Sequence, residues 1–245
     1  MTGLTTDMLT TDIEIAGLCV RLCHSDPWLK KQCRDFLAKE GSEISLEISV
    51  SKEEIEAQAK ETPDYAIGYC ESICLYRALV KKLPAFDRVM FHSCAIEANG
   101  KAYAFCGRSG AGKSTHAELW VKHFGAEYIN GDKPIFKKES GGFLACGSPW
   151  SGKEPNRKRP VSVPLRSLCF IEQSKDNRIV PLSRKDAAKM LLGQVVLPED
   201  AEALFQTMAL VDELSKTVPM FVLSCDISKE AATLSFETMT KGDEK

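Results

Sequence analysis

The residues best suited to chemistry lie in one glycine-rich stretch near the middle of the chain. Residues 107–114 are Gly-Arg-Ser-Gly-Ala-Gly-Lys-Ser, which matches the Walker A pattern Gly-x-x-x-x-Gly-Lys-Ser. Glycines let backbone N–H groups converge on phosphate oxygens, and a helix that begins near the lysine adds free N–H groups and the positive end of its dipole. The stretch predicts a P-loop that binds a nucleoside triphosphate through Gly107, Ser109, Gly110, Ala111, Gly112, Lys113, Ser114 and Thr115.

Two side chains of this loop have distinct expected roles. Lys113 can reach the β- and γ-phosphates, and the Ser114 hydroxyl can coordinate Mg²⁺. We therefore expect ATP and Mg²⁺ as cofactors. A regulatory GTPase would need an Asn-Lys-x-Asp guanine reader, and residues 130–133, Asn-Gly-Asp-Lys, are not one. A motor ATPase would usually show a long apolar strand that ends in paired acids, and the sequence has no such strand.

Two residues outside the loop are candidates for the reaction itself. Asp132 follows a short predicted strand after the loop's helix, and it could bind Mg²⁺ or accept a proton from an attacking hydroxyl. The alternative is an ordinary turn aspartate. His92 precedes Gly107 by fifteen residues and could approach the γ-phosphate, although a single histidine on a strand is usually structural. The candidate catalytic set is Asp132, His92 and Lys113, with Ser114 and Asp132 as metal ligands.

A basic segment could add positive charge to the site. Residues 147–160 are rich in glycine and proline and contain the cations Lys153, Arg157, Lys158 and Arg159. We expect a mobile loop that closes over the phosphates, because phosphoryl transfer needs cations near the equatorial oxygens. Arg157 and Lys158 are the candidate cofactor contacts. The alternatives are a solvated basic turn or a short RNA-binding patch, which lacks interleaved aromatic residues beyond Trp150.

The elements around the loop are predicted from periodicity and turn signals. We expect a strand over 88–97, an Asn99-Gly100 hairpin turn, a return strand over 102–106, a helix over 113–124 and a strand over 126–130. Strands are also predicted over 143–146, 165–172 and 220–225, and helices over 184–192 and 198–218. An antiparallel hairpin therefore feeds the glycine loop.

The N-terminal third is predicted as a separate unit. It contains a strand over 13–23, a helix over 26–38, a strand over 44–50, a helix that begins at Ser51 and a helix over 65–83. We divide the chain into an N-terminal α/β subdomain, 1–85, packed on a P-loop kinase-like core, 86–240. The fold class is α/β, with a mixed, partly antiparallel sheet and flanking helices.

Composition limits the partners. The formal net charge of the 245-residue chain is −2, so no overall positive field recruits nucleic acid or an anionic membrane. There is neither a signal-like N-terminus nor an apolar run of about 20 residues, and we expect a cytoplasmic protein with reduced cysteines. Cys19, Cys23, His24 and Cys33 lack zinc-site spacing, which favours core cysteines over a structural metal. A homo-oligomer stays open.

Residues 88–171 together resemble the HPr kinase/phosphorylase and phosphoenolpyruvate carboxykinase-like superfamily. The likeness is carried by His92 before the loop, the antiparallel entry, Asp132 after the helix, and a Gly-x-x-Trp-Ser-Gly-Lys stretch followed by basic residues and Val-Pro-Leu. It is closer to the small HPr-kinase-related proteins, some of which modify peptides. The family usually has adjacent aspartates where Gly131-Asp132 stands, and the phosphorylase signature of HPr kinases is missing. Phosphorolysis and HPr as substrate are therefore disfavoured.

The resemblance implies a phosphoenolpyruvate carboxykinase/HPr kinase C-terminal-domain-like fold and an ATP- and Mg²⁺-dependent kinase. The acceptor would be a hydroxyl, either a serine of a peptide or protein or a small molecule. A nucleotide-sensing module without turnover is the first alternative. A carboxykinase is the second, disfavoured because the chain is short and shows no dicarboxylate or second-metal site.

Overall fold

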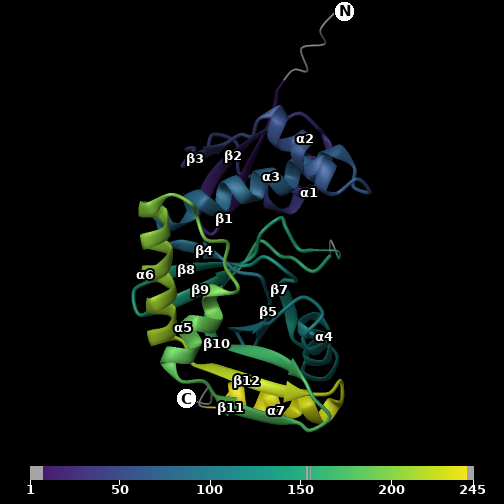
Figure 1. The fold of residues 1–245 in the computed structure, drawn as a ribbon, viewed down its shortest axis with the longest axis vertical. Helices are drawn as coiled ribbons and strands as arrows, with labels where there is room; N and C mark the ends of the chain where they lie inside the picture. Colours follow the sequence, from purple (N-terminus) through teal and green to yellow (C-terminus); the bar gives the residue numbers. More distant parts are fainter. Residues whose placement is uncertain (1–7, 153, 155, 242–245) are drawn as a thin grey trace, which may run out of the picture.

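The computed structural model describes residues 8–152, 154 and 156–241, and within these residues the strands form two sheets (Figure 1). One sheet has three strands in the order β1-β2-β3. The other has nine, of which seven follow the order β4-β8-β9-β10-β6-β5-β7. The remaining two are β12, which pairs with β10, and β11, which pairs with β12. Both sheets contain parallel and antiparallel pairs. The predicted mixed α/β class with a partly antiparallel sheet is confirmed.

The N-terminal unit begins with a hairpin where one strand was predicted. β1 (Leu9–Ile15) pairs antiparallel with β2 (Leu18–His24), so the prediction of a single strand over 13–23 was wrong. Ala16 and Gly17 make the turn with φ of 49° and 74°. An alanine is rarely found in this left-handed region, which is why the sequence did not signal a turn.

The other N-terminal elements are shorter than predicted or agree with the prediction. The helix expected over 26–38 is α1 (Trp28–Gln32) followed by the 3₁₀ turn η1 (Arg34–Phe36), and it ends because Leu37 is extended. β3 (Leu46–Ile48) pairs parallel with β2. α2 (Lys52–Glu61) begins with the expected Ser51–Glu54 capping box, and α3 (Ile67–Lys82) leads into the 3₁₀ turn η2 (Leu83–Phe86).

The larger sheet is built around one long strand, β10 (Ser162–Gln173). Its first residues pair antiparallel with β9 (Gly142–Cys146), while its later residues pair parallel with β6 (Lys101–Cys106) and with β12 (Met220–Cys225). β5 (Ser93–Ala98) lies antiparallel between β6 and β7 (Glu127–Asn130). The predicted hairpin into the glycine loop is therefore confirmed.

Three elements were missed and one strand was predicted as continuous where it is broken. The missed elements are β8 (Ile135–Glu139), β11 (Arg178–Pro181) and the helix α7 (Lys229–Met239). The strand predicted over 88–97 is divided into β4 (Arg88–Met90), which pairs with β8, and β5, which pairs with β6. The chain changes strand partners at Phe91-His92, and an apolar periodicity cannot reveal such a change.

Helices cover both faces of the larger sheet (Figure 1). α5 (Arg184–Leu192) and α6 (Ala201–Thr217) bury Leu191 and Leu214 in a cluster that contains Ala104 and Cys106 of β6. α4 (Lys113–Phe124) and α7 bury residues in another cluster, which contains Phe105, the alternate residue of the same strand. Successive strand residues point to opposite faces, so β6 is buried on both sides.

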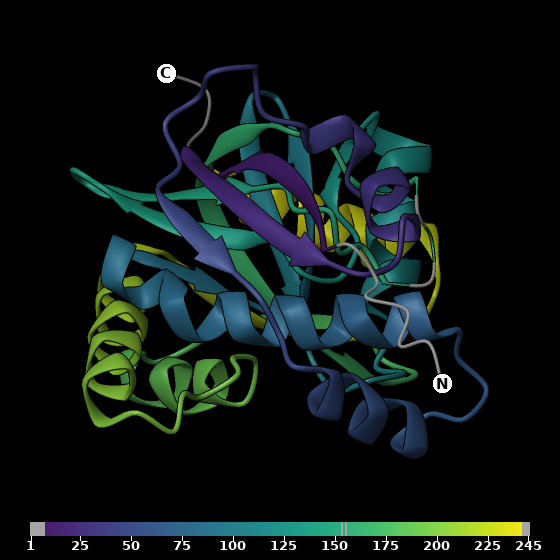
Figure 2. The same ribbon diagram turned by 90° about the horizontal axis from the view of Figure 1, so that it is seen from above.

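The N-terminal unit shares a core with the larger sheet. α3 runs across the molecule above that sheet (Figure 2). Leu75 and Leu79 of α3 belong to one buried cluster with Ile135 of β8 and Trp150. This contact fixes where α3 lies relative to the segment that follows β9.

All ten cysteines are free and buried, and the His24 ring contacts Thr11 and the Asp26 carbonyl. Within the described part of the chain, no group of three metal-ligating side chains occurs, and no helix is long and apolar enough to cross a membrane.

Candidate functional site

The glycine loop connects β6 to α4 and needs its glycines. Gly107, Gly110 and Gly112 have φ of 143°, 80° and 103°, in a region that disfavours side chains. A Cβ at Gly107 would lie 3.1 Å from the Ile171 carbonyl oxygen. The helix predicted over 113–124 is confirmed, and Ser114 and Thr115 are exposed in its first turn, as Ser109 and Gly110 are in the loop.

Lys113 lies inside the curve of this loop. Its Nζ donates to the carbonyl oxygens of Gly107 at 2.8 Å and Arg108 at 3.2 Å. Burial lowers the pKa of Lys113, while the negative charge of Asp132 acts in the opposite direction. The ammonium is therefore held by the backbone carbonyls of the glycine loop itself.

The loop and the Asp132 turn leave the same edge of the sheet. β6 and β7 are both antiparallel to β5, so they run in the same direction and end at neighbouring positions. Adjacent strands lie about 4.8 Å apart, which places the starts of the loop and the turn roughly 10 Å apart. His92, immediately before β5, lies at that edge between them.

A buried asparagine shapes the Asp132 turn. The Asn130 side chain accepts from the backbone N–H groups of Asp132 at 2.9 Å and Lys133 at 2.6 Å, and its amide donates to the Ser148 carbonyl at 3.0 Å. Gly152 packs on the other side, where a Cβ would lie 3.0 Å from the Asp132 Cβ. The turn is therefore positioned by Asn130 and by the segment that contains Ser148 and Gly152.

Asp132 is paired with two cationic or potentially cationic groups. Its carboxylate lies 2.6 Å from Lys133 Nζ and 3.1 Å from His92 Nε2. Burial alone would raise the pKa of Asp132, but the hydrogen bond from His92 and the charge and hydrogen bond of Lys133 outweigh it and hold the pKa well below its usual range. Asp132 is thus a permanent anion at neutral pH.

Gly131 occupies a place with no room for a second carboxylate. A Cβ there would lie 3.0 Å from the Arg157 Cβ and 3.2 Å from the Ser151 carbonyl oxygen. Gly131 N also donates to the Arg157 carbonyl at 2.7 Å. Ser151 and Arg157 therefore leave little space for a second aspartate side chain at position 131.

The basic segment is anchored along most of its described length. Lys153 lies outside the described residues. Trp150 is buried, and its Nε1 donates to Ser72 Oγ at 3.0 Å. Lys158 Nζ donates to the carbonyls of Gln32 at 2.7 Å and Pro149 at 3.0 Å. These contacts argue against the expected free movement of residues 148–151 and of Lys158.

The arginines of this segment have different neighbours. Arg157 pairs with Glu118 of α4 at 2.9 Å and with Glu154, and it lies over the Tyr128 ring. It therefore lies beside the helix that begins at Lys113. Arg159 pairs with Glu97 and Glu127, each at 2.7 Å. Among the three of these cations that the structure describes, Arg157, Lys158 and Arg159, Arg157 lies beside both the Asp132 turn and α4.

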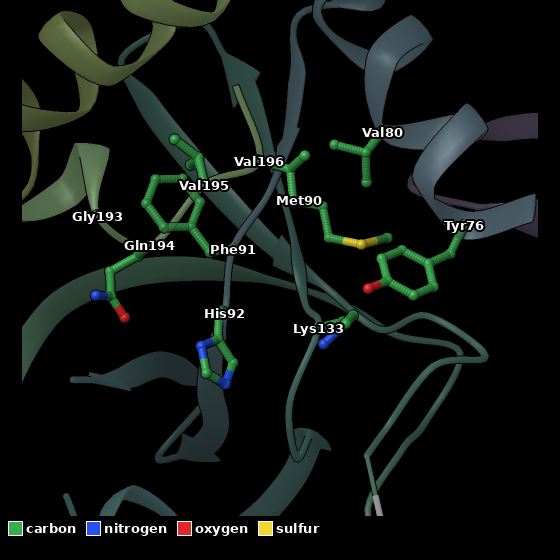
Figure 3. A pocket seen from close by; sticks show the side chains of 10 residues that line it. All are labelled: Tyr76, Val80, Met90, Phe91, His92, Lys133, Gly193, Gln194, Val195 and Val196. Atoms are coloured by element: carbon green, nitrogen blue, oxygen red, sulfur yellow. The ribbon is translucent and has the colours of Figure 1, made fainter. Parts of the chain in front are cut away.

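Sequence reasoning missed Gln194, which joins the two halves of the site. Its side-chain oxygen accepts from Gly107 N at 3.1 Å, and its main-chain oxygen accepts from His92 N at 2.8 Å. It follows α5 in a stretch with no motif, so nothing in the sequence marked it. Gln194, His92 and Lys133 border a pocket of about 290 Å³ whose other side is apolar (Figure 3).

Two further hollows lie on either side of the loop and the turn. A cleft of about 990 Å³ opens beside Asp132 and Lys133, between α1, α3 and residues 149–152, Asn156 and Lys158. A hollow of about 390 Å³ lies beside Gly110–Gly112 and Thr115, near the end of β12. The glycine loop and the Asp132 turn therefore each border a separate hollow.

Comparison with known proteins gives a family. The model of the family described as SynChlorMet cassette protein ScmC matches residues 61–232, and the chain belongs to this family. No curated protein matches the chain. The matched segment contains the loop, the Asp132 turn, His92 and Gln194, and it leaves β1, β2, α1 and α2 largely outside.

Proposed function

We propose that this member of the ScmC family is an ATP- and Mg²⁺-dependent phosphotransferase that phosphorylates a hydroxyl group. The observation that carries the proposal is the shared sheet edge of the glycine loop and the Asp132 turn, separated by one strand. A Walker A loop alone supports nucleotide binding. A partly buried, ionised carboxylate beside it supports chemistry at the terminal phosphate.

The residues present suit a magnesium nucleotide. Mg²⁺ is usually held by one or two carboxylates together with substrate phosphates, so a protein cage of three or more ligands is not needed. Ser114 and Asp132 would provide the hydroxyl and the carboxylate, and the bound metal would neutralise charge on the β- and γ-oxygens. In the proposal, Lys113 and the N–H groups of the loop bind the phosphates.

The low pKa of Asp132 defines its role in the proposal. A general base works best when its pKa is near the working pH, and Asp132 is far below that. Phosphoryl transfer through a loose transition state needs orientation and charge stabilisation more than early proton removal. Asp132 would therefore orient the acceptor hydroxyl and bind metal, while His92, Lys133 and Arg157 stabilise charge on the transferring group.

The test is transfer of label from ATP carrying radioactive γ-phosphate, with cell extract as the source of acceptors and mass spectrometry of the product. The native protein should label an acceptor, and the Lys113→Ala and Asp132→Asn variants should not. If native protein and Asp132→Asn both bind ATP tightly and are equally slow, the chain is a nucleotide sensor and the phosphotransferase proposal fails.

A further inference from the structure

The cleft beside Asp132 has walls from two parts of the molecule. α1, η1 and α3 of the N-terminal unit form one wall, and the Asp132 turn with residues 149–152, Asn156 and Lys158 forms the other. Its volume of about 990 Å³ lies at the upper end of the range for small-molecule sites, roughly 300–1,000 Å³. The cleft can therefore hold a ligand that extends well beyond a single hydroxyl-bearing group.

The N-terminal wall carries a cluster of three aromatic rings. Trp28 and Tyr69 are 5.7 Å apart between ring centroids, and Tyr65 and Tyr69 are 4.9 Å apart, both edge to face. Trp28 is 38% exposed and Tyr65 48% exposed. Exposed tryptophan and tyrosine side chains that keep fixed ring contacts are typical of binding surfaces, because they offer large contact area at little entropic cost.

Tyr69 connects this aromatic cluster to the Asp132 end of the cleft. Burial raises the pKa of Tyr69, and the charges of Asp132 and Lys133 also act on it. At the same end, Lys133 Nζ lies 5.3 Å from the centre of the Tyr76 ring, and Tyr76 lies 6.2 Å from Trp150. Aromatic side chains therefore line the cleft both beside α1 and beside the candidate reaction centre.

The described lining of the cleft has more basic than acidic side chains, with Lys31, Arg34, Lys133 and Lys158 against Asp35 and Asp132. Lys133 is neutralised by Asp132, and Lys158 is held by carbonyl oxygens. Lys31 has no acidic partner among the described residues, and Arg34 is 3.5 Å from Asp35 in an exposed pair that contributes little. The unpaired charge would favour an acidic ligand.

We propose that this cleft is the acceptor groove, and that it binds an acidic peptide segment that carries a serine or threonine. An apolar side chain of the peptide packs on Trp28, Tyr65 and Tyr69, its carboxylates lie beside Lys31 and Arg34, and its hydroxyl reaches Asp132. This inference rests on the proposed function. Trp28, Lys31 and Arg34 of this surface lie outside the family-matched residues 61–232, whereas Tyr65, Tyr69 and the glycine loop lie within them.

The reaction in this groove follows directly. The hydroxyl oxygen of the peptide forms a bond to the γ-phosphorus of ATP, and the bond from that phosphorus to the bridging oxygen breaks. ADP leaves with the bond's electron pair, and the hydroxyl proton passes to solvent while Asp132 orients the hydroxyl and stays ionised. The products are ADP and a peptide phosphomonoester.

Peptide binding is measured first without nucleotide, so that the groove is tested independently of catalysis. The probe is a short fluorescein-labelled peptide with a serine, a phenylalanine and several aspartates, followed by fluorescence polarisation. A second probe has lysines in place of the aspartates. We expect the acidic probe to bind at least about tenfold more tightly, a difference of about 1.4 kcal/mol.

Matched variants locate the binding surface. Lys31→Glu combined with Arg34→Glu should weaken binding of the acidic probe at least about tenfold. Lys30→Glu combined with Lys39→Glu makes the same change in net charge on exposed residues outside the cleft. This control pair should change the affinity for the acidic probe less than about twofold. Trp28→Ala should weaken binding of both probes, because it removes the apolar contact.

The outcomes separate this inference from the proposed function. If neither probe binds, or if both pairs of charge reversals act equally, the groove assignment is overturned, even when Asp132-dependent transfer to a small molecule is found. If the acidic probe binds through Lys31 and Arg34 and native protein with Mg·ATP phosphorylates its serine, the inference is supported. If the probe binds in this way but native protein never consumes ATP, the proposed function fails and the groove is not an acceptor site.

Discussion

The glycine loop and the Asp132 turn lie at one sheet edge but are stabilised in different ways. Most of the loop's contacts are local, since Lys113 bonds to Gly107 and Arg108, and Ala111 N bonds to the Arg108 carbonyl. The turn depends on partners from distant segments. Asp132 itself contacts His92, and Asn130 is fixed by Ser148.

The difference teaches which half of a site can be altered without affecting the other. A local loop keeps its shape as long as its strand and helix remain, so variants there should change nucleotide binding alone. A turn assembled from distant segments responds to changes in any of them. In the proposed enzyme, the loop sets affinity for ATP and the turn sets the rate.

The largest effect is expected from Lys113→Ala. It removes the loop's ammonium and should reduce Mg·ATP affinity by at least about 100-fold, since hydrogen bonds to charged groups are worth about 1.5–3 kcal/mol each. Isothermal titration calorimetry measures it, with Lys122→Ala, on an exposed position of the same helix, as the control. If Lys113→Ala keeps the affinity of the native protein for Mg·ATP, the glycine loop is not the nucleotide-binding site.

Asp132→Asn should separate rate from affinity. We expect turnover to fall by about 10²–10³, comparable to the loss of one charge-stabilising group in other enzymes, with ATP affinity changed only a few-fold. Steady-state ATP consumption and calorimetry on the same samples check this. Asp176→Asn, at an exposed loop position, is the control. A parallel fall in affinity would mean that the turn binds nucleotide as strongly as the loop does.

Acid should lower the free energy of unfolding through His116 of α4, the helix that follows the glycine loop, while Asp132 remains ionised. Burial lowers the pKa of His116 to about 4 from an ordinary 6.5, and its Nε2 is 2.8 Å from Ser235 Oγ. Because the unfolded chain binds a proton more readily, this stability is present above pH 6.5 and is lost as the pH falls toward 4, on the order of 3 kcal/mol.

Urea unfolding at pH 7 and at pH 4.5 measures that loss. The His116→Gln variant should lose much less stability between these pH values than the native protein does. An equal loss in both would show that His116 is not the group responsible. The pKa of Asp132 is lowered, so its contribution is lost only at lower pH, below its ordinary value of 3.8.

The smallest effect is expected from Gly131→Asp, which would introduce the second aspartate usual in the resembling superfamily. The new side chain meets Arg157 and Ser151, so we expect a loss of about 1–3 kcal/mol from overpacking and no gain in turnover. Gly142→Asp, where a Cβ has open space, is the control for thermal melting. If Gly131→Asp turns over faster than the native protein, the claim that one aspartate is sufficient in this turn is wrong.

The sequence predicted the locally encoded half of the site well. The Asn99-Gly100 hairpin and the helix after the loop were expected and are present. It did not predict Gln194 or the break at His92, because both depend on which strands become neighbours in the folded sheet. The anchoring of Trp150 on Ser72 joins residues 78 positions apart, and no pattern along the chain signals such a contact.

The most direct test of the central claim, that the loop and the turn form one site, uses paramagnetic Mn²⁺ in place of Mg²⁺. Mn·ATP is added to isotopically labelled native protein, and the broadened backbone amide signals are mapped by nuclear magnetic resonance. The account predicts that the amides of Gly112–Thr115 and of Asp132 and Lys133 broaden together. Broadening at the loop with sharp signals at Asp132 and Lys133 would contradict it.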